Sequence, residues 1–253
     1  MSDPDLLHGE LRLTGRIDTA SNATFLASID GVTVVYKPVA GEHPLWDFAG
    51  LANREVAAYL VSQVLGWNVV PHTWLRDGPM GEGMVQLWQD ADPAQTAVDI
   101  VAAEAVPDTG WRHVFDGRDE NERIVTLIHE DTAPLRRMAV FDIVVNNADR
   151  KGDHILAMSD GHRHGVDHGL TFHAEHKLRT VLWGWLGDAL STDELDGVDR
   201  VIAELSGTLG ETLAGLLSAE EVAALAERCD RLRSAARFPA PTGDMPAVPW
   251  PLF

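Results

Sequence analysis

The hydrophobic pattern of the chain changes once, near Asp90, and this change limits the folds that the chain can adopt. Before it, short runs rich in β-branched and aromatic residues alternate with turn signals, and a single segment has the period of a helix. After it, helical periods predominate. We therefore expect an α+β protein of two lobes: residues 1–88 with strands and one helix, and residues 89–253 mostly helical, with a proline-rich tail from about residue 238.

The first lobe is expected to hold one short strand, a hairpin, a helix and two further strands. A strand near residues 10–13 precedes ATFLASI and VTVVYKPV, and the dipeptide Asp30-Gly31 between these two runs is a strong signal for a hairpin turn. The segment LANREVAAYLVSQVLG has apolar residues at helical spacing, with Gly66 where helices commonly end. The runs NVVPHTWLRD and GEGMVQLWQD then predict two strands.

The second lobe is expected to be mostly helical. DPAQTAVDIVAAEA and TAPLRRMAVFDIVVNN each carry proline in the first turn, and we predict a helix for both. Two short extended pieces, HILAM and HGVDH, follow, and residues 178–236 are predicted to be helical again.

Composition excludes several classes of function. The net charge of −19 disfavours a general surface for nucleic acids or anionic membranes, because phosphates would be repelled over most of the exterior. The sequence has no run of about 18 consecutive apolar residues and no secretory signal pattern. Its single cysteine, Cys229, excludes an internal disulfide. We expect a cytoplasmic protein without integral membrane association, and the oligomeric state is not predicted.

The stretch FDIVVNNADRKGDHILAM, residues 141–158, places two amides, acids, bases and a histidine between two apolar runs. A solvated loop would explain the polarity alone. A catalytic loop between two buried elements would also explain why the chain turns apolar again at once, and we favour it.

Four charged residues point to one chemistry. Lys37 ends a very apolar strand, Glu55 lies near the start of the following helix, and Asp149 and Asp167 flank the two short extended pieces. Phosphoryl transfer from a nucleotide needs a lysine on the phosphates, a carboxylate that holds this lysine, a carboxylate that receives the acceptor proton, and oxygen ligands for a divalent metal. The four residues match these needs.

The ordered motifs SNATF, VVYKP, REVAAYLVSQVLGWNVVPHT, MVQLW, NNADRKGDH and GVDHGLTF resemble the phosphatidylinositol 3-/4-kinase-like group of the protein-kinase-like fold. The motifs are closest to those of type II phosphatidylinositol 4-kinases and more distantly similar to those of HipA-type kinases. The chain looks most like the small actinobacterial members of the group. The resemblance runs from about Gly15 to Phe172. It implies a bilobal kinase fold that binds ATP with Mg²⁺.

The resemblance also implies residue roles. Lys37 would contact the α- and β-phosphates and pair with Glu55, Asp149 would be the catalytic aspartate, and Asp167 would bind metal. A loop with Ser21, Asn22 and Ala23 would cover the phosphates, and a hinge of Gln86, Leu87 and Trp88 would bind adenine.

The sequence departs from the group at one metal ligand and in the phosphate loop. Where relatives have a metal-binding asparagine, this chain has His154, a nitrogen donor that favours softer metals, so Mn²⁺ is an alternative to Mg²⁺. The phosphate loop lacks the G-x-G-x-x-G pattern of protein kinases. Arg150 and Lys151 are further candidates to position phosphate or acceptor.

We therefore expect a kinase that transfers the γ-phosphate of ATP to an alcohol. The acceptor is expected to be a soluble polyol or inositol-like head group, or else a protein Ser or Thr. Two alternatives remain: a nucleotide-binding pseudokinase, and a zinc hydrolase built on the histidines between residues 154 and 176 together with Asp153 and Asp167.

Overall fold

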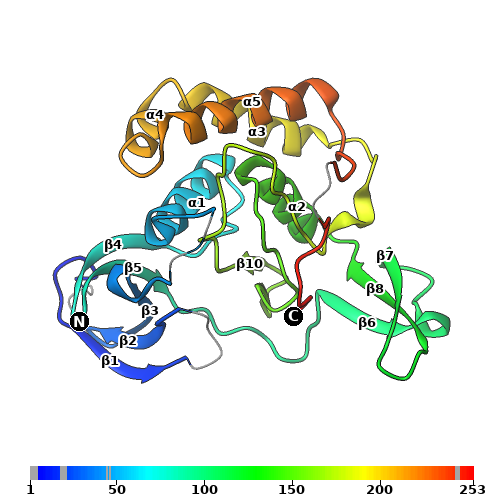
Figure 1. The fold of residues 1–253 in the computed structure, drawn as a ribbon, viewed down its shortest axis with the longest axis horizontal. Coiled ribbons are helices and arrows are strands. Elements are labelled where there is room, and N and C mark those ends of the chain that lie inside the picture. Colours follow the sequence, from blue (N-terminus) through cyan, green and yellow to red (C-terminus); the bar gives the residue numbers. More distant parts are fainter. Residues whose placement is uncertain (1–4, 18–21, 44, 46, 243–245) are drawn as a thin grey trace.

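The computed structural model describes residues 5–17, 22–43, 45, 47–242 and 246–253. A sheet-rich N-terminal region is followed by a part that contains most of the helices (Figure 1). This confirms the α+β class and the expected order of the two regions. The boundary at residue 88 remains a prediction.

The N-terminal region is built on an antiparallel five-stranded sheet with the strand order β1-β2-β3-β5-β4. Its strands are β1 (Leu11–Arg16), β2 (Phe25–Ile29), β3 (Val32–Pro38), β4 (Thr73–Gly78) and β5 (Gly81–Leu87). All five predicted strands are thus confirmed. The predicted turn between β2 and β3 is present, with φ of 50° at Asp30 and 85° at Gly31, as a two-residue hairpin of this kind requires.

Strand β3 lies in the centre of this sheet and positions Lys37. Successive side chains of a strand point to opposite faces, and Val34 and Tyr36 are fully buried in the small core on one face. Lys37 therefore projects from the other face, and its ammonium group contacts helix α1 (Leu51–Leu65).

Helix α1 packs into the main core of the protein and connects the two regions. Ala57, Val61 and Leu65 are fully buried there. The helix ends as predicted, because Gly66 adopts the left-handed conformation with φ of 76°. At its start the carboxylate of Glu42 accepts the N–H groups of Leu51 and Ala52, two donors that would otherwise lack a helical partner.

The C-terminal part packs four helices around the main core: α2 (Ala133–Val145), α3 (Thr192–Glu204), α4 (Thr208–Leu213) and α5 (Ala219–Ala235). Helix α2 confirms the predicted helix of that segment, and it ends where Asn146 adopts a left-handed conformation with φ of 54°. Residues 178–190 precede α3 and contain only a short 3-10 turn, so the predicted helical region begins later than expected. No helix in the described ranges is long and apolar enough to cross a membrane.

The helix predicted for residues 92–105 is wrong. Asp92 accepts the N–H of Ala94 and forms a turn, and the β-branched residues that follow form β6 (Val98–Ala102). This strand pairs with β8 (Ile124–Glu130), which also pairs with β7 (Trp111–Arg118). The second part of the chain therefore carries a three-stranded sheet of its own, beside α2 in Figure 1.

The polar part of the stretch 141–158, residues 146–154, connects α2 to a short hairpin. The hairpin consists of β9 (Ile155–Ala157) and β10 (Arg163–Gly165), which confirms the two predicted extended pieces. The last residues of the chain run beside this loop: the N–H of Gly152 donates to the carbonyl of Leu252 at 2.8 Å. In the described part of the tail, residues 246–253 form no helix or strand, as predicted.

Candidate active site

Lys37 joins two acidic side chains from distant parts of the chain. Its ammonium nitrogen lies 2.7 Å from Oε1 of Glu55 on α1 and 2.8 Å from Oδ1 of Asp167, which follows β10. Glu55 is 2% exposed, so its charge depends on this contact and on the N–H of His168, which donates to its second oxygen at 2.9 Å. The structure thus brings together three of the predicted site residues.

The opposite charges of Lys37 and its two acidic partners, Glu55 and Asp167, stabilise the charged form of Lys37. Burial alone would lower the pKa of Lys37, but the negative charges of Asp167 and Glu55 outweigh it and raise that pKa. The positive charge of Lys37 holds the pKa of Asp167 well below its ordinary value. Both groups are therefore charged across the physiological pH range.

Asp167 is held by an unusual backbone conformation. Its φ is 61°, in the left-handed region that residues other than glycine adopt only rarely. Next but one in the chain, Gly169 packs so closely on helix α1 that a Cβ there would lie 3.2 Å from Cβ of Leu51. Backbone conformations of this kind concentrate at functional sites.

Asp149 lies on the loop that follows α2. Its backbone N–H donates to the side-chain oxygen of Asn147 at 3.0 Å, and the neighbouring Ala148 donates to the carbonyl of Leu170 at 2.8 Å. These bonds fix the loop against the segment after Asp167. Burial raises the pKa of the Asp149 carboxyl, and the positive charge of Lys151 only partly opposes this.

His154 lies between the two aspartates. Its Nδ1 is 2.8 Å from the carbonyl oxygen of Asp149, so Nδ1 carries the proton and donates it. This leaves the lone pair of Nε2 free, 3.6 Å from Oδ2 of Asp167. A nitrogen lone pair beside a carboxylate oxygen is a donor set that fits Mn²⁺ better than Mg²⁺, which prefers oxygen ligands.

A cavity of about 220 Å³ lies between the N-terminal sheet, α1 and the loop that follows α2, and its described lining does not include His154. Six of the predicted site residues take part in it: Asn22, Ala23, Lys37, Glu55, Asp149 and Asp167. Ser21, which the sequence analysis assigned to the same loop as Asn22, lies outside the described residues.

The loop of Asn22 and Ala23 is closed by contacts with the end of β3. The N–H of Ala23 lies 3.3 Å from the carbonyl of Gly41, and the side-chain oxygen of Asn22 accepts the N–H of His43 at 2.8 Å. A Cβ on Gly41 would overlap Cβ of Ala23, so the close approach of the loop needs glycine there.

The predicted hinge residues are not brought to this cavity. Its described lining does not include Gln86, Leu87 or Trp88. The N–H groups of Leu87 and Trp88 donate to carbonyls of His72 and Thr33, and the buried amide of Gln86 donates to Thr73. Their role in adenine binding stays a prediction, and these two N–H groups already have partners.

Sequence reasoning missed a buried network behind the site. Arg150 is fully buried and bonds the carboxylate of Asp142, itself fully buried, and Nε2 of His168 at 2.7 Å. Arg150 therefore cannot contact phosphate or acceptor directly, because its guanidinium faces the core. The one signal in the sequence was its position directly after Asp149. Lys151, the other candidate to position phosphate or acceptor, lies 3.7 Å from Oδ2 of Asp149, and its role stays a prediction.

The histidines of the polar region do not meet at one point, although the rings of His162 and His164 pack edge to face with centroids 4.3 Å apart. Nε2 of His162 is 2.9 Å from the carbonyl of Asn68, His168 is buried beside Arg150, and the ring of His173 packs on Phe48. Across the described part of the chain, no group of three or more His, Cys, Asp or Glu side chains could hold a metal ion. The zinc hydrolase alternative, which needs three protein ligands, has no such set there.

Comparisons with known proteins found a similar curated protein and similar solved structures. No protein-family model matches the chain. A crystal structure of a Helicobacter pylori proinflammatory kinase, CtkA, is similar with a TM-score of 0.47 and 12% identity, over 91% of this chain and 93% of that one. Protein Rv2133c of Mycobacterium tuberculosis is 48% identical over 98% of this chain and 94% of its own length. The chain therefore belongs to the same family as this mycobacterial protein.

Proposed function

We propose that this protein is an ATP-dependent phosphotransferase of the phosphatidylinositol 3-/4-kinase-like kind, which transfers the γ-phosphate to an alcohol. The observation that carries the proposal is the position of Lys37, which bridges Glu55 and Asp167 in a cavity that Asp149 also lines. Phosphoryl transfer depends on positioning and on charge stabilisation more than on covalent chemistry, and this cavity offers both.

Lys37 is suited to hold the phosphates. Its ammonium group is kept charged by two carboxylates, and Glu55 fixes its position from a rigid helix. When a triphosphate enters, one of the contacts of Lys37 can be exchanged for a phosphate oxygen while Glu55 retains the other. The backbone near Asn22 and Ala23 would cover the phosphates from the opposite side.

Asp167 and His154 are suited to hold the divalent cation. Asp167 is charged, and the free lone pair of His154 lies beside it. Mg²⁺ is commonly bound by one or two protein ligands together with substrate phosphates, so two ligands suffice. The metal, when bound, would neutralise charge on the phosphates during transfer.

Asp149 is suited to accept the proton of the acceptor. Its raised pKa makes this carboxylate a stronger base than an exposed aspartate. The acceptor oxygen forms a bond to the γ-phosphorus, and the bond from this phosphorus to the bridging oxygen breaks. ADP leaves with the electron pair, and Asp149 takes the proton from the acceptor.

The test follows the label of γ-labelled ATP with Mg²⁺ or Mn²⁺ and candidate alcohols. The wild-type protein is expected to release ADP and transfer the label. Asp149→Asn is expected to lower turnover by a factor of about 10² to 10⁴ while ATP still binds. Asp167→Asn is expected to remove the metal-dependent part of ATP binding as well. Asp196→Asn, an exposed residue of α3, is the matched control.

Retention of most turnover in Asp149→Asn would refute its role as base. Binding of ATP without ADP release by the wild-type protein, whatever the acceptor, would support the pseudokinase alternative instead.

A further inference from the structure

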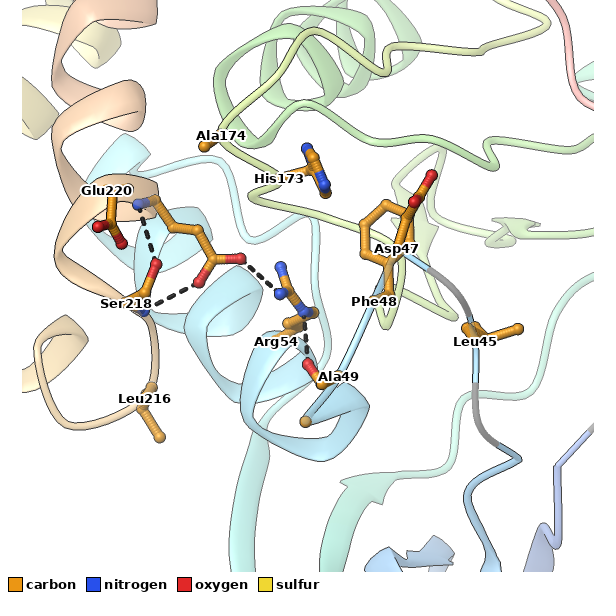
Figure 2. A pocket seen from close by; sticks show the side chains of 12 residues that line it. Leu45, Asp47, Phe48, Ala49, Arg54, His173, Ala174, Leu216, Ser218 and Glu220 are labelled. Carbon is orange, nitrogen blue, oxygen red and sulfur yellow. Dashed lines mark hydrogen bonds and ion pairs between the residues drawn. The ribbon is translucent and has the colours of Figure 1, made fainter.

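Figure 2 shows a second and more open cavity, of about 600 Å³. It is formed by the segment around Phe48, the start of α5 and the segment around His173. Its size is within the range of about 300–1,000 Å³ that is typical of small-molecule sites. Leu45 lines both this cavity and the one that contains Lys37.

The second cavity is connected to Asp149 by two segments that run side by side. Ala148 donates to the carbonyl of Leu170, which lines the first cavity, and Asn146 donates to the carbonyl of His173, which lines the second. The Cα atoms of Asn146 and Asp149 are three residues apart and can be separated by at most about 11 Å. The segment that carries Asp149 therefore runs beside the wall of the second cavity.

The groups that would attract an anion to this cavity are already occupied by the protein. The guanidinium group of Arg54 donates to the carbonyls of Ala49 and Thr171 and to the carboxylate of Glu221. Figure 2 shows the contact between Arg54 and Ala49. The first turn of α5 is satisfied by the capping box of Ser218 and Glu221. The carboxylate of Glu221 thus occupies the position beside Arg54 and the start of α5 that an anionic ligand would need.

The remaining charges of the lining are negative. Glu220 is exposed at the start of α5, and Asp47 is 43% exposed and 3.2 Å from Lys177. Lys177 is in turn 3.2 Å from Glu175, so its charge does not reverse the balance. The negative charge of the whole protein adds to this field and attracts cations to its clefts.

The cavity also offers apolar ring surface. The rings of Phe48 and His173 meet edge to face, with centroids 5.4 Å apart. Such rings pack against the C–H groups of a sugar-like skeleton.

We infer that this second cavity is the acceptor site of the proposed phosphotransferase, and that the acceptor is a cationic alcohol, an aminated sugar or polyol. The inference rests on the proposed function. The ammonium group of the acceptor would lie near Asp47 and Glu220, and its skeleton would pack on Phe48 and His173. A hydroxyl group of the acceptor would then extend toward Asp149 in the first cavity. The transfer step is the one described above, and the ammonium group remains unchanged.

The experiment compares acceptor pairs that differ only in an amine: glucosamine with glucose, and an aminated inositol with inositol. ADP release is measured with the full-length protein, ATP and Mn²⁺ or Mg²⁺. The aminated member of at least one pair is expected to have a kcat/KM at least about tenfold higher than its neutral partner, a difference of about 1.4 kcal/mol.

The role of the lining is tested by Glu220→Gln, alone and combined with Asp47→Asn. Each substitution is expected to raise KM for the aminated acceptor by about fivefold with little change in kcat, as loss of a partly exposed charge pair would. KM for the neutral partner is expected to stay constant. Glu227→Gln, on the same helix and outside the cavity lining, is the matched control.

Faster turnover of the neutral acceptors, acceleration by neither member of any pair, or an unchanged KM in both variants would overturn the inference while leaving the phosphotransferase intact. Absence of both ATP binding and ADP release in the wild-type protein would overturn the proposed function and the inference together.

Discussion

The ammonium nitrogen of Lys37 lies 2.7 Å from Oε1 of Glu55, and this contact ties the central strand β3 to helix α1. Glu55→Gln removes the charge of the partner and keeps its shape. We expect the affinity for ATP to fall by a factor of about 10 to 100, because a hydrogen bond to a charged group contributes about 1.5–3 kcal/mol. Titration calorimetry with ATP and metal measures it, with Glu211→Gln on α4 as the control. An unchanged affinity would contradict the role of Glu55.

The stability of the protein is expected to depend on pH through Asp149. Burial raises the pKa of this carboxyl above its ordinary value of 3.8, so the folded state holds the proton more tightly than the unfolded state. As pH rises above 3.8, the free energy of unfolding therefore falls, until Asp149 is ionised in both states. Asp149→Asn removes this cost.

Asp149→Asn is therefore expected to be more stable than the wild-type protein at about pH 7, with the difference shrinking toward about pH 4. Urea unfolding at both pH values measures this difference, and Asp196→Asn should show none. If Asp149→Asn were less stable at neutral pH, the charged carboxylate would be stabilised by its surroundings, and the sign of the argument would be reversed.

The contact between Gly152 and the chain tail predicts a steric effect. A Cβ on Gly152 would overlap the ring of Phe253. Gly152→Ala is expected to cost about 1–3 kcal/mol, as other insertions into packed sites do. In a Phe253→Ala background the same substitution should cost much less. Chemical denaturation of the four proteins gives the coupling energy, and strictly additive costs would show that the two residues are independent.

Arg150 is expected to be essential for folding and not for binding of phosphate. Arg150→Met leaves the carboxylate of Asp142 buried without its charged partner, which is expected to cost about 3–5 kcal/mol. Arg150→Met combined with Asp142→Leu should recover much of this loss. A stable Arg150→Met protein with weakened ATP binding would place Arg150 in the site after all.

Elements with local signals were predicted correctly from the sequence. The Asp30-Gly31 turn, the glycine after α1 and the proline at the start of α2 each determine the backbone nearby, and all three elements are present. Strand β6 was predicted as a helix, because its conformation depends on pairing with β8, more than twenty residues later in the chain.

Site residues were predictable where chemistry requires a particular side chain. Lys37, Glu55, Asp149 and Asp167 were recognised in this way, and they line one cavity. Glu42 was missed, because its contact with the start of α1 is invisible until the loop between them is folded. The burial of Arg150 could likewise not be predicted, since a charged residue in a polar loop is normally expected to face solvent.

The most direct measurement is a structure of the protein with a non-hydrolysable ATP analogue and Mn²⁺. The account predicts that the triphosphate occupies the cavity lined by Lys37 and Asp167, with the metal bound by Asp167 and His154 and with Lys37 still paired to Glu55. A nucleotide bound outside this cavity, or a metal held by other residues, would contradict it.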